Sequence, residues 1–307
     1  MSTLNKTQTR SITRGVSSLS SWIIGARPHT LCLSATPVAL GAAIAWAVER
    51  KTNWLAVSAA LIASLCIQIG TNLHNDVVDS KLGGDGPDRL GPPRVTAIGL
   101  LTATAVKRGA ALSFGIAALI GSYLVSIGGW PILLLGLFSI VSGWAYTAGP
   151  FPIAYTPFGE VFVLAFFGLG AVSGTYWLCT ANLGSAAVIG GLALGSLTSA
   201  VLLVNNHRDA IVDARVGRRT LAILVGPFAT ICIFAGLVLT PIALLAPFGD
   251  ALPRGHIWPA LLILPLALRL AYRFAREPRG PGFNRILVQT AQVQSLFALL
   301  LCLGLLI

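Results

Sequence analysis

Apolar runs of about twenty residues recur along this chain, and they constrain its fold more than any other feature. A helix needs about 20 apolar residues to cross the hydrocarbon core of a bilayer, and nine such runs can be marked between residues 30 and 307. Only 10% of the 307 residues are charged, whereas about 25% is usual in a soluble globular protein. The sequence therefore predicts an all-α, polytopic membrane protein with nine transmembrane helices.

Short polar segments separate the predicted spans. One of them, Gly128-Gly129-Trp130-Pro131, predicts a tight turn between the third span and the fourth. The nine predicted spans cover residues 30–48, 54–75, 100–126, 131–146, 158–179, 186–206, 221–246, 257–272 and 286–307. Residues 1–25 are basic and are expected to form a disordered cytoplasmic tail, with a transit peptide as the alternative. Residues 26–307 then form one membrane domain.

The distribution of positive charge predicts how the spans are oriented. If the N-terminus is cytoplasmic, all but three of the 21 lysines and arginines fall on the cytoplasmic side, and the exceptions are Arg50, Lys51 and Arg254. Because lysine and arginine are enriched in cytoplasmic loops, the chain is expected to run N-in and C-out. The net charge of +11 has the same explanation, so a nucleic-acid partner is not expected.

The second span ends on an unusually polar stretch, Asn72-Leu73-His74-Asn75-Asp76-Val77-Val78-Asp79. Spacings of i, i+4 and i+7 place Asn72, Asp76 and Asp79 on one helix face, and Asn75 lies four residues before Asp79. Transmembrane helices usually carry Lys, Arg, Trp or Tyr where they end at the membrane–water interface, so a helix end with amides and carboxylates is atypical. Such oxygen groups are the ligands that Mg2+ prefers.

A second acidic segment follows the sixth span and repeats this order. Asn205, Asp209 and Asp213 lie at i, i+4 and i+8 on one helix face. In both segments amides come first, then paired carboxylates, then arginines beyond a glycine, which suggests an internal duplication. Six of the ten acids lie in these two segments: Asp76, Asp79, Asp85, Asp88, Asp209 and Asp213.

Two oxygen-rich clusters on one side of a membrane suit a substrate that has a diphosphate head and a long apolar tail. Mg2+ bridges phosphate to carboxylate, arginines bind the remaining phosphate oxygens, and the apolar interior accepts the tail. Helix capping or interfacial ion pairing is the alternative for either segment alone. Two matched segments favour function, because ionisable residues at membrane depth are costly.

Cysteine and histidine patterns give no support to other metal sites. The five cysteines lie in apolar runs without a C-x-x-C pair, and the four histidines form no H-x-x-x-H pair. We therefore expect no disulfide framework and no zinc or histidine-ligated metal.

The two acidic segments resemble the signature motifs of the UbiA-type intramembrane aromatic prenyltransferases. The matching residues are Asn75-Asp76-Val77-Val78-Asp79 and Asp209-Ala210-Ile211-Val212-Asp213. Similarity extends over residues 26–226 and is greatest to the 1,4-dihydroxy-2-naphthoate polyprenyltransferases of menaquinone synthesis. Gly83 stands where the general first motif ends in Asp, which leaves Asp85 as the expected substitute. Ser80 stands where benzoate-type enzymes commonly carry a basic residue, and both departures favour the naphthoate or a related quinone branch.

This resemblance implies a ring of nine helices around a central cavity, with Mg2+-dependent transfer of a polyprenyl group from polyprenyl diphosphate to an aromatic acceptor. The carboxylates that it implies as catalytic are Asp76, Asp79, Asp209 and Asp213. The implied Mg2+ ligands are these four together with Asn72, Asn75, Asp85 and Asn205. The implied diphosphate-binding residues are Lys81, Arg94, Arg208 and Arg219. Candidates for contact with the acceptor or the carbocation are Arg27, Tyr146, Tyr155 and Glu160, with membrane-interface anchoring or packing as the alternative.

Three other functions stay open on the sequence alone. Another aromatic acceptor, such as homogentisate, fits the same site. A carboxylate-based cation transporter would carry its acids near mid-span, whereas these acids lie with arginines at the cytoplasmic ends. An alcohol phosphotransferase would need a compact D-G-x-x-A-R array, which the sequence lacks. The expected location is the cell (inner) membrane, and the oligomeric state is left open.

Overall fold

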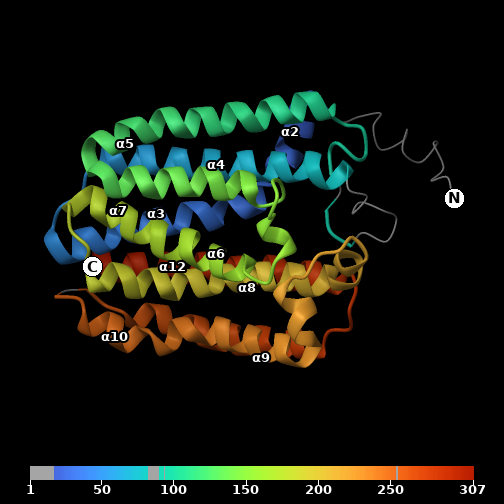
Figure 1. Cartoon of the computed structure of the whole chain (residues 1–307). Helices are drawn as coiled ribbons and strands as arrows, with labels where there is room; N and C mark the ends of the chain where they lie inside the picture. Colours follow the sequence, from blue (N-terminus) through green and yellow to red (C-terminus); the bar gives the residue numbers. More distant parts are fainter. Residues whose placement is uncertain (1–16, 82–89, 93, 254) are drawn as a thin grey trace, which may run out of the picture.

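The chain folds into a bundle of long helices that run in alternating directions (Figure 1). The computed structural model describes residues 17–81, 90–92, 94–253 and 255–307. Within these residues every regular element is helical, and eight helices or continuous helical runs are long and apolar enough to cross a membrane. The prediction of an all-α, multi-pass membrane protein is confirmed.

The helices match the predicted spans, with boundaries that shift by a few residues. The elements are α2 (Ser18–Ala26), α3 (Pro28–Glu49), α4 (Trp54–Lys81), α5 (Ala103–Ala145), η1 (Ile153–Tyr155), α6 (Gly159–Val163), η2 (Leu164–Gly170), α7 (Ala171–Thr180), α8 (Ser185–Arg215), α9 (Leu221–Ala243), α10 (Leu245–Asp250), η3 (Trp258–Ile263), α11 (Leu264–Arg276) and α12 (Gly282–Leu306). Both α4 and α8 continue several residues beyond their predicted ends, so both acidic segments are helical.

A sharp turn divides the 43-residue helix α5 into two arms that lie side by side (Figure 1). Gly129 has φ 68° and ψ −155°, a conformation that glycine adopts without the steric cost of a side chain. The indole N–H of Trp177 on α7 donates a hydrogen bond of 2.8 Å to the Gly128 carbonyl and fixes this turn. The eight candidate spans among the described residues count α5 as one helix, so its division at Gly129 is compatible with the nine spans predicted. That all nine cross the membrane, and that the N-terminus is cytoplasmic, stay predictions.

Helix α8 lies at the centre of the bundle and is the most buried of the candidate spans. Small residues let it approach η2 closely, because a Cβ added to Gly168 would lie 2.4 Å from the Gly191 carbonyl oxygen and 2.6 Å from Gly195 Cα. Close approach through small residues is a common way for helices to associate in membranes. It also brings α8 against α6, where Ser199 donates to the Glu160 carbonyl at 2.7 Å.

The N-terminal tail predicted for residues 1–25 is partly folded, so the expectation of a disordered tail is wrong for its last residues. Ser17 caps α2 by accepting a hydrogen bond of 3.1 Å from the Ser20 backbone N–H. Trp22 packs against a buried cluster that includes Leu73 of α4, while Leu19 is exposed. Residues 1–16 lie outside the described part of the chain.

The ends of α4 and α8 that carry the acidic segments lie on one side of the bundle, the right-hand side in Figure 1. The connection between α3 and α4 lies at the opposite end. The two acidic segments were predicted to share one side of the membrane, and the bundle brings them within ion-pairing distance.

Candidate active site

A cavity of about 1020 Å³ runs into the helix bundle from the end that carries the acidic segments. Asp79, Arg94, Arg208 and Arg218 line its polar end. The rest of the lining is mostly apolar and comes from α3, α4, both arms of α5, the α6–α7 run, α8 and α12. Its size lies at the upper end of the ~300–1,000 Å³ that is usual for small-molecule sites. The arrangement suits a ligand with an anionic head and a bulky apolar tail.

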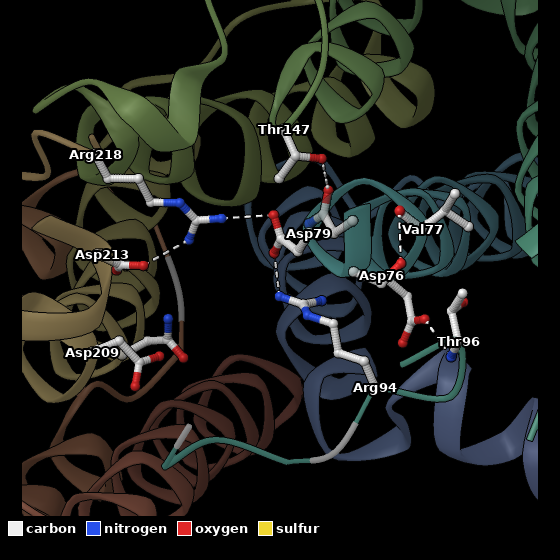
Figure 2. A network of polar contacts seen from close by, with 12 residues as sticks. Asp76, Val77, Asp79, Arg94, Thr96, Thr147, Asp209, Asp213 and Arg218 are labelled. Carbon is white, nitrogen blue, oxygen red and sulfur yellow. Dashed lines mark hydrogen bonds and ion pairs between the residues drawn. The ribbon is translucent and has the colours of Figure 1, made fainter. Parts of the chain in front are cut away.

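Asp79 is the carboxylate at the centre of the polar end, and two guanidinium groups hold it (Figure 2). Arg94 forms a buried ion pair with Asp79 Oδ2. Arg218 Nη2 donates to Asp79 Oδ1 at 2.6 Å. A buried carboxylate needs such partners, because an unpaired charge in a low-dielectric interior is strongly destabilising.

Arg218 joins the two acidic segments. Its Nη1 donates to Asp213 Oδ1 at 3.0 Å, while its Nη2 contacts Asp79 (Figure 2). The guanidinium also lies 5.1 Å from the centre of the Tyr155 ring, in cation–π geometry. Burial alone would lower the pKa of Arg218, but Asp79 and Asp213 outweigh it and raise the pKa above its usual value. Arg218 therefore stays positively charged at the point where the two segments meet.

Arg208 organises the other part of the second segment. It donates to both carboxylate oxygens of Asp209, at 2.8 and 2.6 Å, and to the Asn205 side-chain oxygen at 2.8 Å. Its Nη1 donates to Asn284 of α12 at 2.7 Å. Asn284 in turn donates to the Leu90 carbonyl at 2.8 Å, which links the connection after α4 to α12.

A small polar cavity of about 60 Å³ lies between the two segments, and its donor set has the chemistry that Mg2+ requires. Asp79, Asp209, Asp213 and Asn205 line it with oxygen ligands, and Arg218 occupies the cationic position between two of these carboxylates. Among the described residues, no three His, Cys, Asp or Glu side chains are close enough together to hold a metal ion. The side chains present fit a hard cation chemically, provided that guanidinium contacts are exchanged for metal contacts.

The amides and the first carboxylate of the first segment contact the protein framework. Asn72 donates to the Ala26 carbonyl at 3.0 Å, and Asn75 accepts from the Thr147 hydroxyl at 2.7 Å. Asp76 accepts from two backbone N–H groups after α4. Asn72 and Asn75 still line the large cavity, whereas Asp76 lines neither of the two cavities.

Glu160 is buried beside the second segment. Its Oε1 accepts a hydrogen bond of 2.8 Å from the Asn206 amide, and its Oε2 is buried without a hydrogen-bond partner. Burial raises the pKa of the Tyr146 phenol, and the nearby Glu160 carboxylate adds to the rise. Tyr146 lines the large cavity, so it is a neutral aromatic wall close to the polar end.

The remaining predicted site residues fall into three groups. Arg27 lines both cavities, and its contact with the acceptor stays a prediction. Lys81 and Arg219 are exposed and line neither cavity, so the structure places them away from the site predicted for them. Tyr155 faces Arg218 and does not line either cavity. Asp85 lies outside the described residues.

Sequence reasoning missed three polar residues that the structure brings to the site. No role at the site was predicted for Arg218, although its neighbour in the Gly217-Arg218-Arg219 sequence was predicted to bind the diphosphate. Thr147 lies within a stretch that carried the family resemblance, which was the available signal. No sequence signal pointed to Asn284, because the last span was predicted from hydropathy alone.

Comparison with known proteins identifies the family. Residues 34–287 match the model of the UbiA prenyltransferase family. A 1,4-dihydroxy-2-naphthoate octaprenyltransferase from Bacillus subtilis is 32% identical, over 92% of this chain and 90% of the relative. A protein of the same name from Escherichia coli is 32% identical, over 94% and 96%. A UbiA homolog from Archaeoglobus fulgidus, solved bound to DMAPP and Mg2+, has the same fold, with a TM-score of 0.66 at 14% identity over 94% of this chain and 100% of that one. This chain therefore belongs to the UbiA prenyltransferase family.

Proposed function

We propose that this protein transfers a polyprenyl group from polyprenyl diphosphate to an aromatic acceptor, 1,4-dihydroxy-2-naphthoate, in menaquinone synthesis. One observation carries the proposal: the carboxylates and guanidiniums of both acidic segments meet at the polar end of one large apolar cavity. The names of the relatives supply the acceptor, because both the Bacillus subtilis and the Escherichia coli proteins are naphthoate octaprenyltransferases. The titles of the solved homologs supply prenyl diphosphates and Mg2+ as ligands.

The reaction requires that the diphosphate leave while an allylic carbocation is protected from water. Mg2+, when bound, would neutralise the diphosphate and stabilise it as a leaving group. Asp79, Asp209 and Asp213 would hold the metal, with Asn75 and Asn205 as further oxygen donors. Arg94, Arg208 and Arg218 face the same space, and they would bind the phosphate oxygens that the metal leaves free.

The apolar part of the cavity would bind the prenyl tail and exclude water from the carbocation. Tyr146 lies at the boundary between the polar and apolar parts, where its ring face would stabilise the cation. Glu160 and Asn206 form a buried polar pair beside Tyr146, and we assign to this pair the positioning of the acceptor. The bond from the allylic carbon to the diphosphate oxygen breaks, and a ring carbon of the acceptor forms a new bond to that allylic carbon. The ring then regains its aromaticity when the substituted carbon loses its own group, as a proton or as CO2.

Purified protein in lipid nanodiscs tests the proposal directly. It is incubated with Mg2+, a polyprenyl diphosphate and one acceptor at a time: 1,4-dihydroxy-2-naphthoate, homogentisate or 4-hydroxybenzoate. Mass spectrometry of the products is expected to show prenylated naphthoate product that requires Mg2+. Preferred turnover of another acceptor would replace the naphthoate assignment, and no transfer to any acceptor would overturn the proposed function.

We also propose that the acidic end of the bundle faces the cytoplasm of the cell (inner) membrane. The charge distribution supports this orientation. Arg50 and Lys51, two of the three basic residues that are not predicted on the cytoplasmic side, follow α3 at the opposite end of the bundle. A cysteine placed at Lys51 should react with a membrane-impermeant reagent from outside the cell. Labelling from the cytoplasmic side alone would reverse the orientation.

A further inference from the structure

Asp76 belongs to the first acidic segment, yet its surroundings differ from those of Asp79. The residue is 2% exposed. Its Oδ1 accepts a hydrogen bond of 2.9 Å from the Thr96 backbone N–H (Figure 2). Its Oδ2 accepts one of 2.9 Å from the Val95 backbone N–H. Both carboxylate oxygens are therefore bonded to the backbone of the connection between α4 and α5.

The connection forms a compact turn that begins at these two amides. The Ile98 N–H donates to the Arg94 carbonyl at 3.1 Å, and the Leu100 N–H to the Val95 carbonyl at 2.9 Å. The first N–H groups of such a turn have no acceptor within it, as at the start of a helix. A carboxylate that accepts from two successive N–H groups satisfies them in the manner of a helix N-cap.

Arg94 immediately precedes the two amides that Asp76 binds. Its guanidinium pairs with Asp79, which lies three residues after Asp76 on α4 and on the same helix face. Val95 is fully buried in a cluster with Leu73 and Val77 of α4. Helix α4 thus holds this turn at three points: a backbone contact, a packed side chain and an ion pair.

We infer that Asp76 is a positioning residue that fixes the backbone at Val95 and Thr96 so that Arg94 faces the diphosphate. This role replaces the metal-ligand role expected from the sequence. The inference rests on the proposed function, because it assumes that Arg94 binds the diphosphate. The distinction between the two roles is chemical: the backbone contact needs hydrogen-bond acceptors, whereas a metal ligand at this position would contribute negative charge as well.

Two substitutions separate these roles. Asp76→Ser retains a capping oxygen, because serine caps helices about as well as aspartate, and Asp76→Ala retains none. Asp76→Ser should keep the KM for polyprenyl diphosphate within about threefold of the wild-type value. Asp76→Ala should raise it by about tenfold to hundredfold, the effect of losing hydrogen bonds to a charged group. The Mg2+ concentration at half-maximal activity should be unchanged in both variants, whereas the matched control Asp79→Ser should raise it.

Amide hydrogen exchange without substrates gives a readout that is independent of activity. The Val95 and Thr96 amides should be protected in the wild-type protein and in Asp76→Ser, and should exchange at least about tenfold faster in Asp76→Ala. Unchanged protection of α8 shows that the variants are folded. Equal KM values for the Ser and Ala variants, a raised Mg2+ requirement in Asp76→Ser, or unchanged exchange in Asp76→Ala would each overturn the inference. If the wild-type protein transfers no prenyl group, the proposed function fails, while the exchange comparison still decides what Asp76 does.

Discussion

The two acidic segments share their order of residues but differ in what their side chains contact. In the described part of the first, which ends at Lys81, Asn75 bonds Thr147 and Asp76 bonds backbone amides, while Asp79 pairs with two arginines. In the second, both carboxylates meet arginine: Asp209 pairs with Arg208, and Asp213 pairs with Arg218.

The difference shows that a repeated sequence pattern does not imply a repeated role. Asp76 and Asp209 occupy matching places in their segments, yet Asp76 is almost fully buried, whereas the side chain of Asp209 is 16% exposed and lines the small polar cavity. Among the described residues of the first segment, Asn75 and Asp76 bond the surrounding protein and Asp79 pairs with arginine. The second segment contributes charge through both of its carboxylates.

Metal removal tests both segments at once and should have the largest effect. Chelation with EDTA should lower prenyl transfer by at least about a thousandfold, because charge stabilisation of the leaving group supplies much of the rate. Product formation is measured by mass spectrometry before and after Mg2+ is returned, which should restore it. Full transfer in EDTA would remove the functional basis for comparing the segments as metal-binding elements.

Asp79 should be the most sensitive single position, because it is where the first segment enters the charged site. Asp79→Ala should lower kcat/KM by about 10²–10³-fold, in the range found when a group that stabilises developing charge is removed. Asp213→Ala should lower kcat/KM by about tenfold, because the Asp213 carboxylate pairs with one guanidinium whereas Asp79 pairs with two. Equal losses would mean that the segments contribute symmetrically. Thermal unfolding in detergent checks that both variants remain folded.

Arg218 should be the residue whose loss separates the two segments. Arg218→Gln should raise the KM for polyprenyl diphosphate by about tenfold to hundredfold, because it removes a charge that bridges two buried carboxylates. The matched control is its exposed neighbour, and Arg219→Gln should stay within about twofold of the wild-type KM, as is usual for exposed charges. The reverse result would restore the sequence-based assignment of Arg219 to the diphosphate.

Thr147→Val should have the smallest effect, and it tests the positioning role of the first segment. The change removes the hydroxyl that donates to Asn75 at 2.7 Å. One hydrogen bond contributes about 1 kcal/mol, so kcat/KM should fall about fivefold. The Mg2+ concentration at half-maximal activity should also rise, because this hydroxyl positions the Asn75 oxygen that is proposed as a metal donor. An unchanged Mg2+ requirement would remove Asn75 from the metal site and would separate the two segments further in role.

Much of the fold was predictable, because hydrophobic run length and turn residues determine membrane helices locally. The long apolar helices and the turn at Gly129 both followed from such signals. Helix α2 was missed, because its apolar face is short and lies within a polar, basic stretch. Its stability comes from Trp22 packing against α4, a contact that local sequence does not reveal.

The site was predictable as a collection of residues but not as a set of contacts. Helical periodicity correctly placed Asp76 and Asp79 on one face, yet the partner of each comes from a connection whose path depends on the whole bundle. The choice between Arg218 and Arg219 depends on Gly217, whose φ of 81° turns the chain so that the first arginine faces inward.

The arginine contacts of Asp79 have a consequence for the catalytic cycle. The same guanidinium groups of Arg94 and Arg218 that would bind diphosphate are already paired with protein carboxylates. An arriving substrate must therefore compete with Asp79 and Asp213, which lowers its affinity. The same competition would favour release of the diphosphate product, because each guanidinium that releases diphosphate regains a carboxylate partner. The carboxylates at the charged end of the bundle would thus help to displace the diphosphate that each turnover leaves behind, and so would oppose product inhibition.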